Sequence, residues 1–265
     1  MKTYATLIAA VAALSLSCAC ASAKQPSAGR TATIVSYQVN TLSKFMEDSA
    51  PVVAEILKVS GADLIGLNSL DSCNARHNIF QLKEVADLFG TDQYYFAPAF
   101  PYKGGSFGEG ILSRRKILKS ETLTLPALGG NGFRAVGIIE TEDCIFAVTQ
   151  LAAEKTGAQQ AEIINDWFTA HYAGSKKPVF LCGHMAGLPD SETIGTFIKK
   201  WRILNNTAIP NYPSKAPDRC YSYIMVLKKS APVKVLHATV LRSNASKSNF
   251  AKAAGHLPVC VTVSF

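Results

Sequence analysis

The sequence Asp63-Leu64-Ile65-Gly66-Leu67-Asn68-Ser69 carries the clearest indication of the fold, because a continuous apolar run ends here in small polar residues. Such a short apolar run, without alternation, predicts a strand buried on both faces over residues 63–70. Upstream, residues 49–59 carry apolar side chains at near-helical spacing and are followed by Gly61, which predicts a helix. Residues 31–39 are rich in β-branched and aromatic residues and predict a first strand.

The same alternation of elements continues downstream. Helices are predicted over residues 80–89, closed by Gly90, over residues 161–172 and over residues 191–201. Strands are predicted between turns rich in Gly, Pro and charge, at residues 94–96, 110–113, 121–125, 135–141, 144–151, 178–182, 222–226, 233–241 and 257–265. Groups of strands separated by helices predict an α/β domain in which two sheets carry helices on their outer faces.

Composition bounds the class of protein. The chain has 265 residues, of which 48% are hydrophobic and 17% are charged, which favours one globular domain and excludes disorder. A net charge of +8 favours anionic partners in general but gives no strong nucleic-acid signal. Short basic clusters at residues 114–116 and 199–202 are interpreted as solvated surface.

The N-terminus has the order of a secretory signal. Lys2 precedes an apolar run over residues 7–16 and a small-residue stretch over residues 17–23. We therefore predict a signal peptide over residues 1–23, a linker over 24–29, a domain over 30–265, and export to the periplasm or the extracellular space. Cys18 is a candidate for lipidation, which would anchor the protein to the cell envelope. The apolar run is too short to span a bilayer, and no later segment is long enough.

Five cysteines follow the predicted signal, at positions 73, 144, 182, 220 and 260. Their wide spacing shows no metal-binding CxxC pair and no dense disulfide framework. Most lie in apolar, strand-like contexts, so we interpret them as buried small hydrophobic residues.

Seven stretches lie in an order and at a spacing typical of one protein family. They are Val35-Ser36-Tyr37-Gln38-Val39, Asp63 to Ser69, Gly108-Glu109-Gly110-Ile111-Leu112-Ser113, Val148-Thr149-Gln150-Leu151, Phe180-Leu181-Cys182-Gly183-His184-Met185-Ala186, Tyr221-Ser222-Tyr223-Ile224 and Gly255-His256-Leu257-Pro258-Val259. On these motifs the chain resembles the endonuclease/exonuclease/phosphatase superfamily, which has the deoxyribonuclease I-like fold. The resemblance implies a four-layered α/β sandwich, with two packed, mostly antiparallel sheets flanked by helices.

The resemblance also implies Mg²⁺-dependent phosphoester hydrolysis, but the family's polar positions are replaced here. Where the family carries metal-binding and catalytic Asn, Glu, His and Asp side chains, this chain has Gln38, Ser69, Gln150, His184, Ala186, Ser222 and Gly255, and of the eight characteristic positions only His256 is retained. These eight positions are expected to converge on one cleft. Asp71 is no replacement for the lost Glu, because relatives often carry both. The family's Mg²⁺ ligands are absent, so we expect no cofactor and a degenerate member of the superfamily.

Two other patterns in the sequence resemble functional sites. Gly104-Gly105-Ser106-Phe107-Gly108 matches a G-x-S-x-G elbow, but Pro101 precedes it and a strand follows, which favours a hairpin loop. His184 and His256 could hold Zn²⁺ only with a third protein ligand, and none is evident unless Cys182 turns inward, so we expect no metal site.

The motifs leave three hypotheses for function. The first is a non-catalytic binding protein, a pseudoenzyme, whose cleft holds an anionic small molecule or a glycan. Its candidate ligand-binding residues are Arg76, Tyr102, Lys103 and Arg134, with binding strengthened as His184 and His256 protonate below pH ~6.5. The second is a metal-dependent phosphodiesterase or phosphomonoesterase, since fold alone does not establish function. The third is a structural or assembly protein of the cell envelope. None of the three hypotheses implies an oligomeric state.

Overall fold

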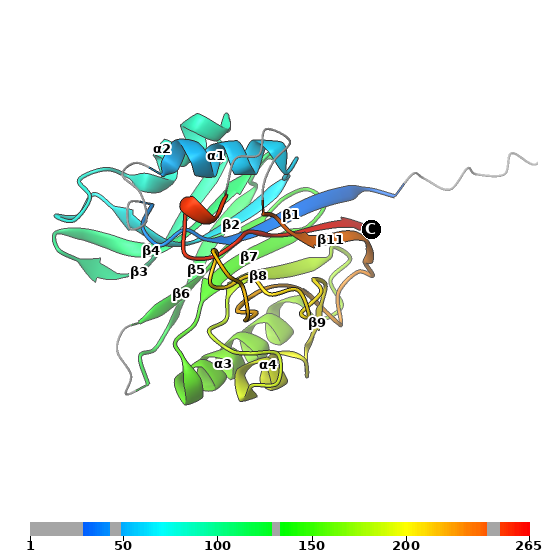
Figure 1. Ribbon diagram of the computed structural model, residues 1–265. Coiled ribbons are helices and arrows are strands. Elements are labelled where there is room, and N and C mark those ends of the chain that lie inside the picture. The colour runs from blue at the N-terminus through cyan, green and yellow to red at the C-terminus, as the bar shows by residue number, and fades with distance from the viewer. Residues whose placement is uncertain (1–28, 43–48, 129–132, 243–249) are drawn as a thin grey trace, which may run out of the picture.

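Two six-stranded sheets pack face to face in the computed structural model, and each sheet is covered on its outer side by helices (Figure 1). The structure describes residues 29–42, 49–128, 133–242 and 250–265. The predicted signal peptide, most of the linker and Cys18 lie outside these residues. Within them, no helix has both the length and the apolar character needed to cross a membrane.

The first sheet has the strand order β11-β12-β1-β2-β4-β3. Its elements are β1 (Thr31–Gln38), β2 (Leu64–Ser72), β3 (Tyr94–Tyr102), β4 (Gly105–Ser113), β11 (Lys234–Val240) and β12 (Val259–Ser264), with helices α1 (Ala50–Val59) and α2 (Gln81–Phe89) outside. Only β1 and β2 run parallel, and the other neighbours are antiparallel.

The second sheet has the order β5-β6-β7-β8-β10-β9. Its elements are β5 (Lys119–Leu125), β6 (Arg134–Glu140), β7 (Ile145–Gln150), β8 (Val179–His184), β9 (Trp201–Ile203) and β10 (Ser222–Leu227), with helices α3 (Glu154–Tyr172) and α4 (Glu192–Phe197) outside. Again one central pair, β7 and β8, is parallel, and the rest are antiparallel. The four-layered sandwich of mostly antiparallel sheets is confirmed.

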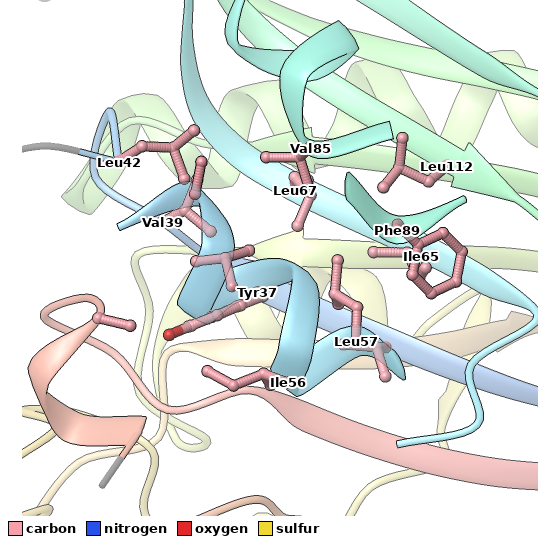
Figure 2. Packing of buried hydrophobic residues seen from close by; sticks show 14 of the residues in the cluster. Tyr37, Val39, Leu42, Ile56, Leu57, Ile65, Leu67, Val85, Phe89 and Leu112 are labelled. Atoms are coloured by element: carbon pink, nitrogen blue, oxygen red, sulfur yellow. The ribbon is translucent and has the colours of Figure 1, made fainter. Parts of the chain in front are cut away.

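Three layers of apolar side chains lie between the four layers of helices and sheets. One lies between the first sheet and its helices, where Tyr37, Leu57, Leu67 and Val85 come from β1, α1, β2 and α2 (Figure 2). A second lies between the two sheets and contains Ile34, Phe146, Phe180 and Ile224, and a third lies under α3 and α4. Central strands face apolar layers on both sides, which explains why the sequence of β2 begins with an almost continuous apolar run.

Four elements differ in their bounds from the sequence-based prediction. The helix predicted over residues 191–201 ends at Phe197, because Trp201 pairs with Leu227 and starts β9. The strands predicted at 94–96 and 110–113 extend into a long hairpin through Gly104 and Gly105, so the G-x-S-x-G segment is a hairpin, as expected. Pro98 and Pro101 hid the length of β3, yet they fit because β3 is an edge strand. Helix α3 begins at Glu154, before the predicted residue 161.

The five cysteines after the predicted signal are free thiols. Four of them are buried, as expected, and Cys73 is exposed.

Candidate functional site

The ends of the central parallel strands of both sheets meet at one place. Gln38 ends β1 and Gln150 ends β7, and the Gln38 side-chain amide donates to Gln150 Oε1 at 3.1 Å. Ser69, near the end of β2, donates from its hydroxyl to the same oxygen at 2.6 Å. Because parallel strands end at a common edge, positions far apart in sequence become direct partners across the two sheets. We call this place, with His184 and His256, the strand-end site.

A β-bulge in β2 aims two side chains into this site. Leu67 lies opposite Gly110 and Leu70 lies opposite Gly108, so Asn68 and Ser69 together face the single residue Glu109. Ser69 adopts a φ of 64°, in the left-handed region that non-glycine residues rarely occupy. The bulge therefore costs some backbone strain, and it allows neighbouring residues to serve the same site.

Asn68 is fully buried and joins the sheets from within. Its amide nitrogen donates to Glu109 Oε2 at 2.7 Å and to the Thr149 carbonyl at 2.9 Å, and its amide oxygen accepts from the His184 backbone N–H at 3.1 Å. An amide is suited to this position because it donates and accepts at once.

Four rings form one wall of the site. The imidazoles of His184 and His256 meet edge to face, with ring centroids 4.9 Å apart. Tyr212 lies 4.4 Å from His256, and Tyr221 lies 5.7 Å from His184. Both tyrosines are half-buried, so their rings form an aromatic rim at the edge of the site.

The charges of the site are few. Burial raises the pKa of Glu109 to about 7, although the hydrogen bond from Asn68 and the charge of Arg134 oppose the shift. Burial lowers the pKa of His184 to about 4, with a contribution from Arg134, and burial together with His184 lowers the pKa of His256 to about 3. Both imidazoles are therefore neutral near pH 6, which contradicts the expectation that they protonate below pH ~6.5. Their burial against each other removes the water that would stabilise the charged form.

The site has more hydrogen-bonding capacity than the chain itself uses. Nine buried side-chain polar atoms in the described part of the chain lack a hydrogen-bond partner, and five of them belong here. The five are Glu109 Oε1, Arg134 Nε, His184 Nδ1, Ser222 Oγ and His256 Nδ1. Ser222 pairs with His184 between β10 and β8, and Arg134 acts electrostatically on both Glu109 and His184, so the five residues form one group. Each unmet buried group costs about 1 to 3 kcal/mol, so a polar group that reached these atoms would stabilise the site.

The donor set does not fit a magnesium ion. Mg²⁺ takes oxygen ligands, chiefly carboxylates, but the strand ends carry amides, hydroxyls and neutral imidazoles. The one carboxylate, Glu109, is fully buried and bonded to Asn68. Among the residues that the structure describes, no three His, Cys, Asp or Glu side chains gather as a metal site would require.

Solved structures share this architecture. The chain superposes on an endonuclease/exonuclease/phosphatase from Beutenbergia cavernae with a TM-score of 0.72 and 15% identity, covering 89% of this chain and 72% of the other. It superposes on one from Bacteroides vulgatus with a TM-score of 0.69 and 13% identity, covering 88% and 98%. A mannosyl-6-phosphatase from Bacteroides thetaiotaomicron gives 0.68 and 16%, covering 88% and 100%. The chain has the endonuclease/exonuclease/phosphatase fold. In sequence, it matches no family profile and no curated protein.

The endonuclease/exonuclease/phosphatase fold brings most of the eight characteristic positions together. Gln38 and Ser69 both donate to Gln150, and Ser222, His184 and His256 are adjacent. Gly255 joins them through its backbone N–H, which donates to Asn40 Oδ1 at 3.2 Å, while Asn40 donates from its own N–H to Gln38. Ala186 follows β8 with a φ of 50°.

The candidate ligand-binding residues divide into two places. Arg134 belongs to the strand-end site, beside Glu109. Arg76 instead forms a two-point ion pair with buried Asp71, at 2.8 and 2.7 Å, and lies over the Tyr102 ring at 4.6 Å. Lys103 also lies over Tyr102, at 5.6 Å. The Arg76 guanidinium is thus already committed to a carboxylate of the chain.

Sequence reasoning did not single out Glu109, Asn211 or Tyr212. Asn211 accepts from the backbone N–H groups of Tyr221 and Ser222 at 3.1 and 3.2 Å and so holds the start of β10. Glu109 could have been found from the sequence, because a glutamate between two glycines is unusual in an otherwise apolar strand. Tyr212 and Asn211 lie in a loop, where no periodicity marks them.

Proposed function

We propose that the protein binds a polar ligand at the strand-end site without hydrolysing it. The observation that carries the proposal is the group of five unmet buried polar atoms in a site that lacks a carboxylate set for Mg²⁺. The partly buried side chains of Gln150, His184 and Arg134 are the polar groups through which a ligand would reach these atoms. Export of the protein, suggested by its N-terminal sequence, is part of the same proposal.

The chemistry of the site favours a sugar or a sugar phosphate. Sugar hydroxyls both donate and accept, which matches neutral imidazoles, amides and hydroxyls. Their apolar faces pack on aromatic rings, and Tyr212 and Tyr221 offer such rings at the rim. Arg134 is a single cation that suits one phosphate. The similar structure described as a mannosyl-6-phosphatase supports the same ligand class.

Catalysis is disfavoured by the groups that remain. A general base works best with a pKa near the working pH, whereas those of His184 and His256 lie at about 4 and about 3. Gln150 cannot accept a proton, and Ser69 donates to it instead of holding a metal. Loss of one general acid or base costs roughly 10²- to 10⁴-fold in rate, so the combined loss leaves no efficient hydrolysis.

The test is calorimetric titration of the purified protein with mannose, mannose 6-phosphate and inorganic phosphate, with EDTA or with Mg²⁺. We expect binding in EDTA, weakened at least tenfold in Arg134→Gln for the phosphorylated sugar and little changed for the neutral sugar. Arg202→Gln is the matched control, because Arg202 is exposed on the distant strand β9.

Hydrolysis is measured in parallel with Mg²⁺, Mn²⁺ and Zn²⁺ on phosphomonoesters and phosphodiesters. We expect turnover at the level of a buffer blank. Metal-dependent turnover that disappears in His256→Ala would replace the binding proposal by the hydrolase hypothesis. Absence of binding to all sugars would favour an envelope-assembly role instead.

A further inference from the structure

Two pairs of lysines meet at the end of the second sheet opposite the strand-end site. Strand β10 starts at Ser222 in that site and ends at Leu227, and Lys228 and Lys229 follow it directly. Six residues of strand place these lysines about 20 Å from Ser222. Lys199 and Lys200 precede β9, and the Lys228 N–H donates to the Lys200 carbonyl at 2.9 Å, so the two turns are fixed side by side.

A small cavity lies between these turns and the end of α3. Its volume is about 120 Å³, and it is lined by Thr169, Ala173 and Leu227 together with the four lysines. We call it the lysine pocket. A cavity of this volume has room for one tetrahedral oxyanion together with its water.

In the part of the chain that the structure describes, no acidic side chain pairs with the lysines of this pocket. Lys83 and Lys177 are paired with Asp87 and Glu140, but none of the four pocket lysines forms an ion pair within the described residues. Lys228 has a structural role, because its ammonium donates to the Ile198 carbonyl just after α4 at 2.5 Å. The C-terminal ends of α3 and α4 together offset about one charge at most, which leaves the pocket strongly positive.

The Thr169 hydroxyl adds a second feature that points to a ligand. Thr169 lines the pocket, and its Oγ1 is buried without a hydrogen-bond partner among the described residues. In a helix, a threonine hydroxyl usually bonds a carbonyl one turn earlier, so this unpartnered hydroxyl is an unused donor that lies just beneath the pocket wall and reaches a ligand by rotation about χ1. A hydroxyl donor among ammonium groups is a suitable environment for an oxyanion.

We propose that the lysine pocket binds a phosphate or sulfate group. Lys199, Lys200 and Lys229 supply the charge, and Thr169 supplies a neutral hydrogen bond. The group can belong to a free oxyanion or to a phospholipid head group, since both present the same tetrahedral charge. This site is separate from the strand-end site and does not depend on the function proposed for it.

The first experiment titrates inorganic phosphate and sulfate into Arg134→Gln protein, so that the cation of the strand-end site does not contribute. In this background, Lys200→Gln with Lys229→Gln should weaken binding at least tenfold, and Thr169→Val should weaken it several-fold. The matched control is Lys58→Gln with Lys155→Gln, which removes the same charge from exposed positions outside the cavity and should change the affinity less than twofold. Thermal unfolding of each variant checks that the fold is kept.

The second experiment separates the two sources of the phosphate group. Vesicles of phosphatidylcholine with phosphatidylglycerol are compared with pure phosphatidylcholine in flotation, with free phosphate as competitor. Flotation on anionic vesicles that free phosphate displaces identifies a lipid head group, and phosphate binding without flotation identifies a free oxyanion. The proposal is overturned if no oxyanion or anionic vesicle binds at millimolar concentration, or if the pocket variant binds as well as its control.

Discussion

Ser69 Oγ donates a 2.6 Å hydrogen bond to Gln150 Oε1, and so joins the ends of β2 and β7, which belong to different sheets. Gln150 Oε1 also accepts from Gln38. In this way the chain itself fills the positions where the resemblance implies a metal carboxylate and a catalytic histidine. The site is held together by neutral hydrogen bonds.

The first prediction follows from this shared acceptor. Gln150→Ala leaves two donors unmet and should lower the free energy of unfolding by about 2 kcal/mol, whereas Ser69→Ala should cost about 1 kcal/mol. In a urea denaturation double-mutant cycle, the two changes should couple by roughly 1 kcal/mol. Strict additivity of the two variants would show that the bond contributes nothing to stability.

The second prediction concerns buried Glu109, whose pKa is raised from 4.5 to about 7. A raised pKa means that the folded protein holds this proton more tightly than the unfolded chain does. Stability from the group is therefore present below pH 4.5 and lost as pH rises through about 7, by roughly 3 kcal/mol. Glu109→Gln should remove this loss and be more stable than the native protein at pH 8.

Urea unfolding at pH 5 and pH 8 measures the effect. Glu162→Gln, on the exposed face of α3, is the matched control and should leave the difference between the two pH values unchanged. If the free energy of unfolding of Glu109→Gln depends on pH as that of the native protein does, the raised pKa of Glu109 is contradicted.

The third prediction concerns Asp71, which is fully buried and bound by Arg76 and by His77 Nδ1, the latter at 2.5 Å. Burial would raise its pKa, but the hydrogen bonds from Arg76 and His77 outweigh burial and hold the pKa below its usual value. Its stabilisation is thus present above pH ~4 and lost as pH falls through the lowered pKa. Asp71→Asn should cost about 3 kcal/mol at pH 7 in chemical denaturation.

Asp87→Asn is the control for this change. Asp87 forms an exposed pair with Lys83 one helical turn away, and because solvent screens such a pair, Asp87→Asn should change the stability little. Equal costs for the two variants would mean that burial of Asp71 adds nothing to its ion pair.

The sequence predicts the layers of this fold well, for a physical reason. Strands such as β2 and β8 are apolar on both faces because each is enclosed by a helix layer and a second sheet, and that pattern is local. The hairpin of β3 and β4 was underestimated because its prolines and glycines resemble turn residues. Trp201 was assigned to a helix because its pairing with Leu227 is not visible in the local pattern.

The sequence predicted where the site residues lie better than it predicted their hydrogen bonds and charge states. Ordered motifs place Gln38, Ser69 and Gln150 together, but their shared hydrogen bond depends on a bulge that leaves no sequence signal. Arg76 was predicted to bind a ligand, but in the structure its guanidinium pairs with Asp71, five residues earlier in the sequence. The charge state of the histidines depends on burial by Tyr212 and Tyr221, which only the folded chain defines.

The last prediction tests that charge state. Burial depresses the pKa of His184 to about 4 and of His256 to about 3, so their ring resonances in NMR should show neutral imidazole from pH 7.5 down to pH 5.5. Affinity of the strand-end site for neutral mannose, measured in a Glu109→Gln background so that no site carboxyl titrates, should then be constant over this range, because no site imidazole gains a proton. The unfolded chain does take up these protons below about 6.5, so the histidines destabilise the fold as pH falls from 6.5 toward 4. His256→Gln should reduce that slope in urea unfolding, while His237→Gln on the exposed side of β11 should not. A cationic His184 or His256 at pH 5.5, or an affinity of the Glu109→Gln variant for mannose that changes several-fold between pH 7.5 and 5.5, would show that the two rings are open to water and act as cations.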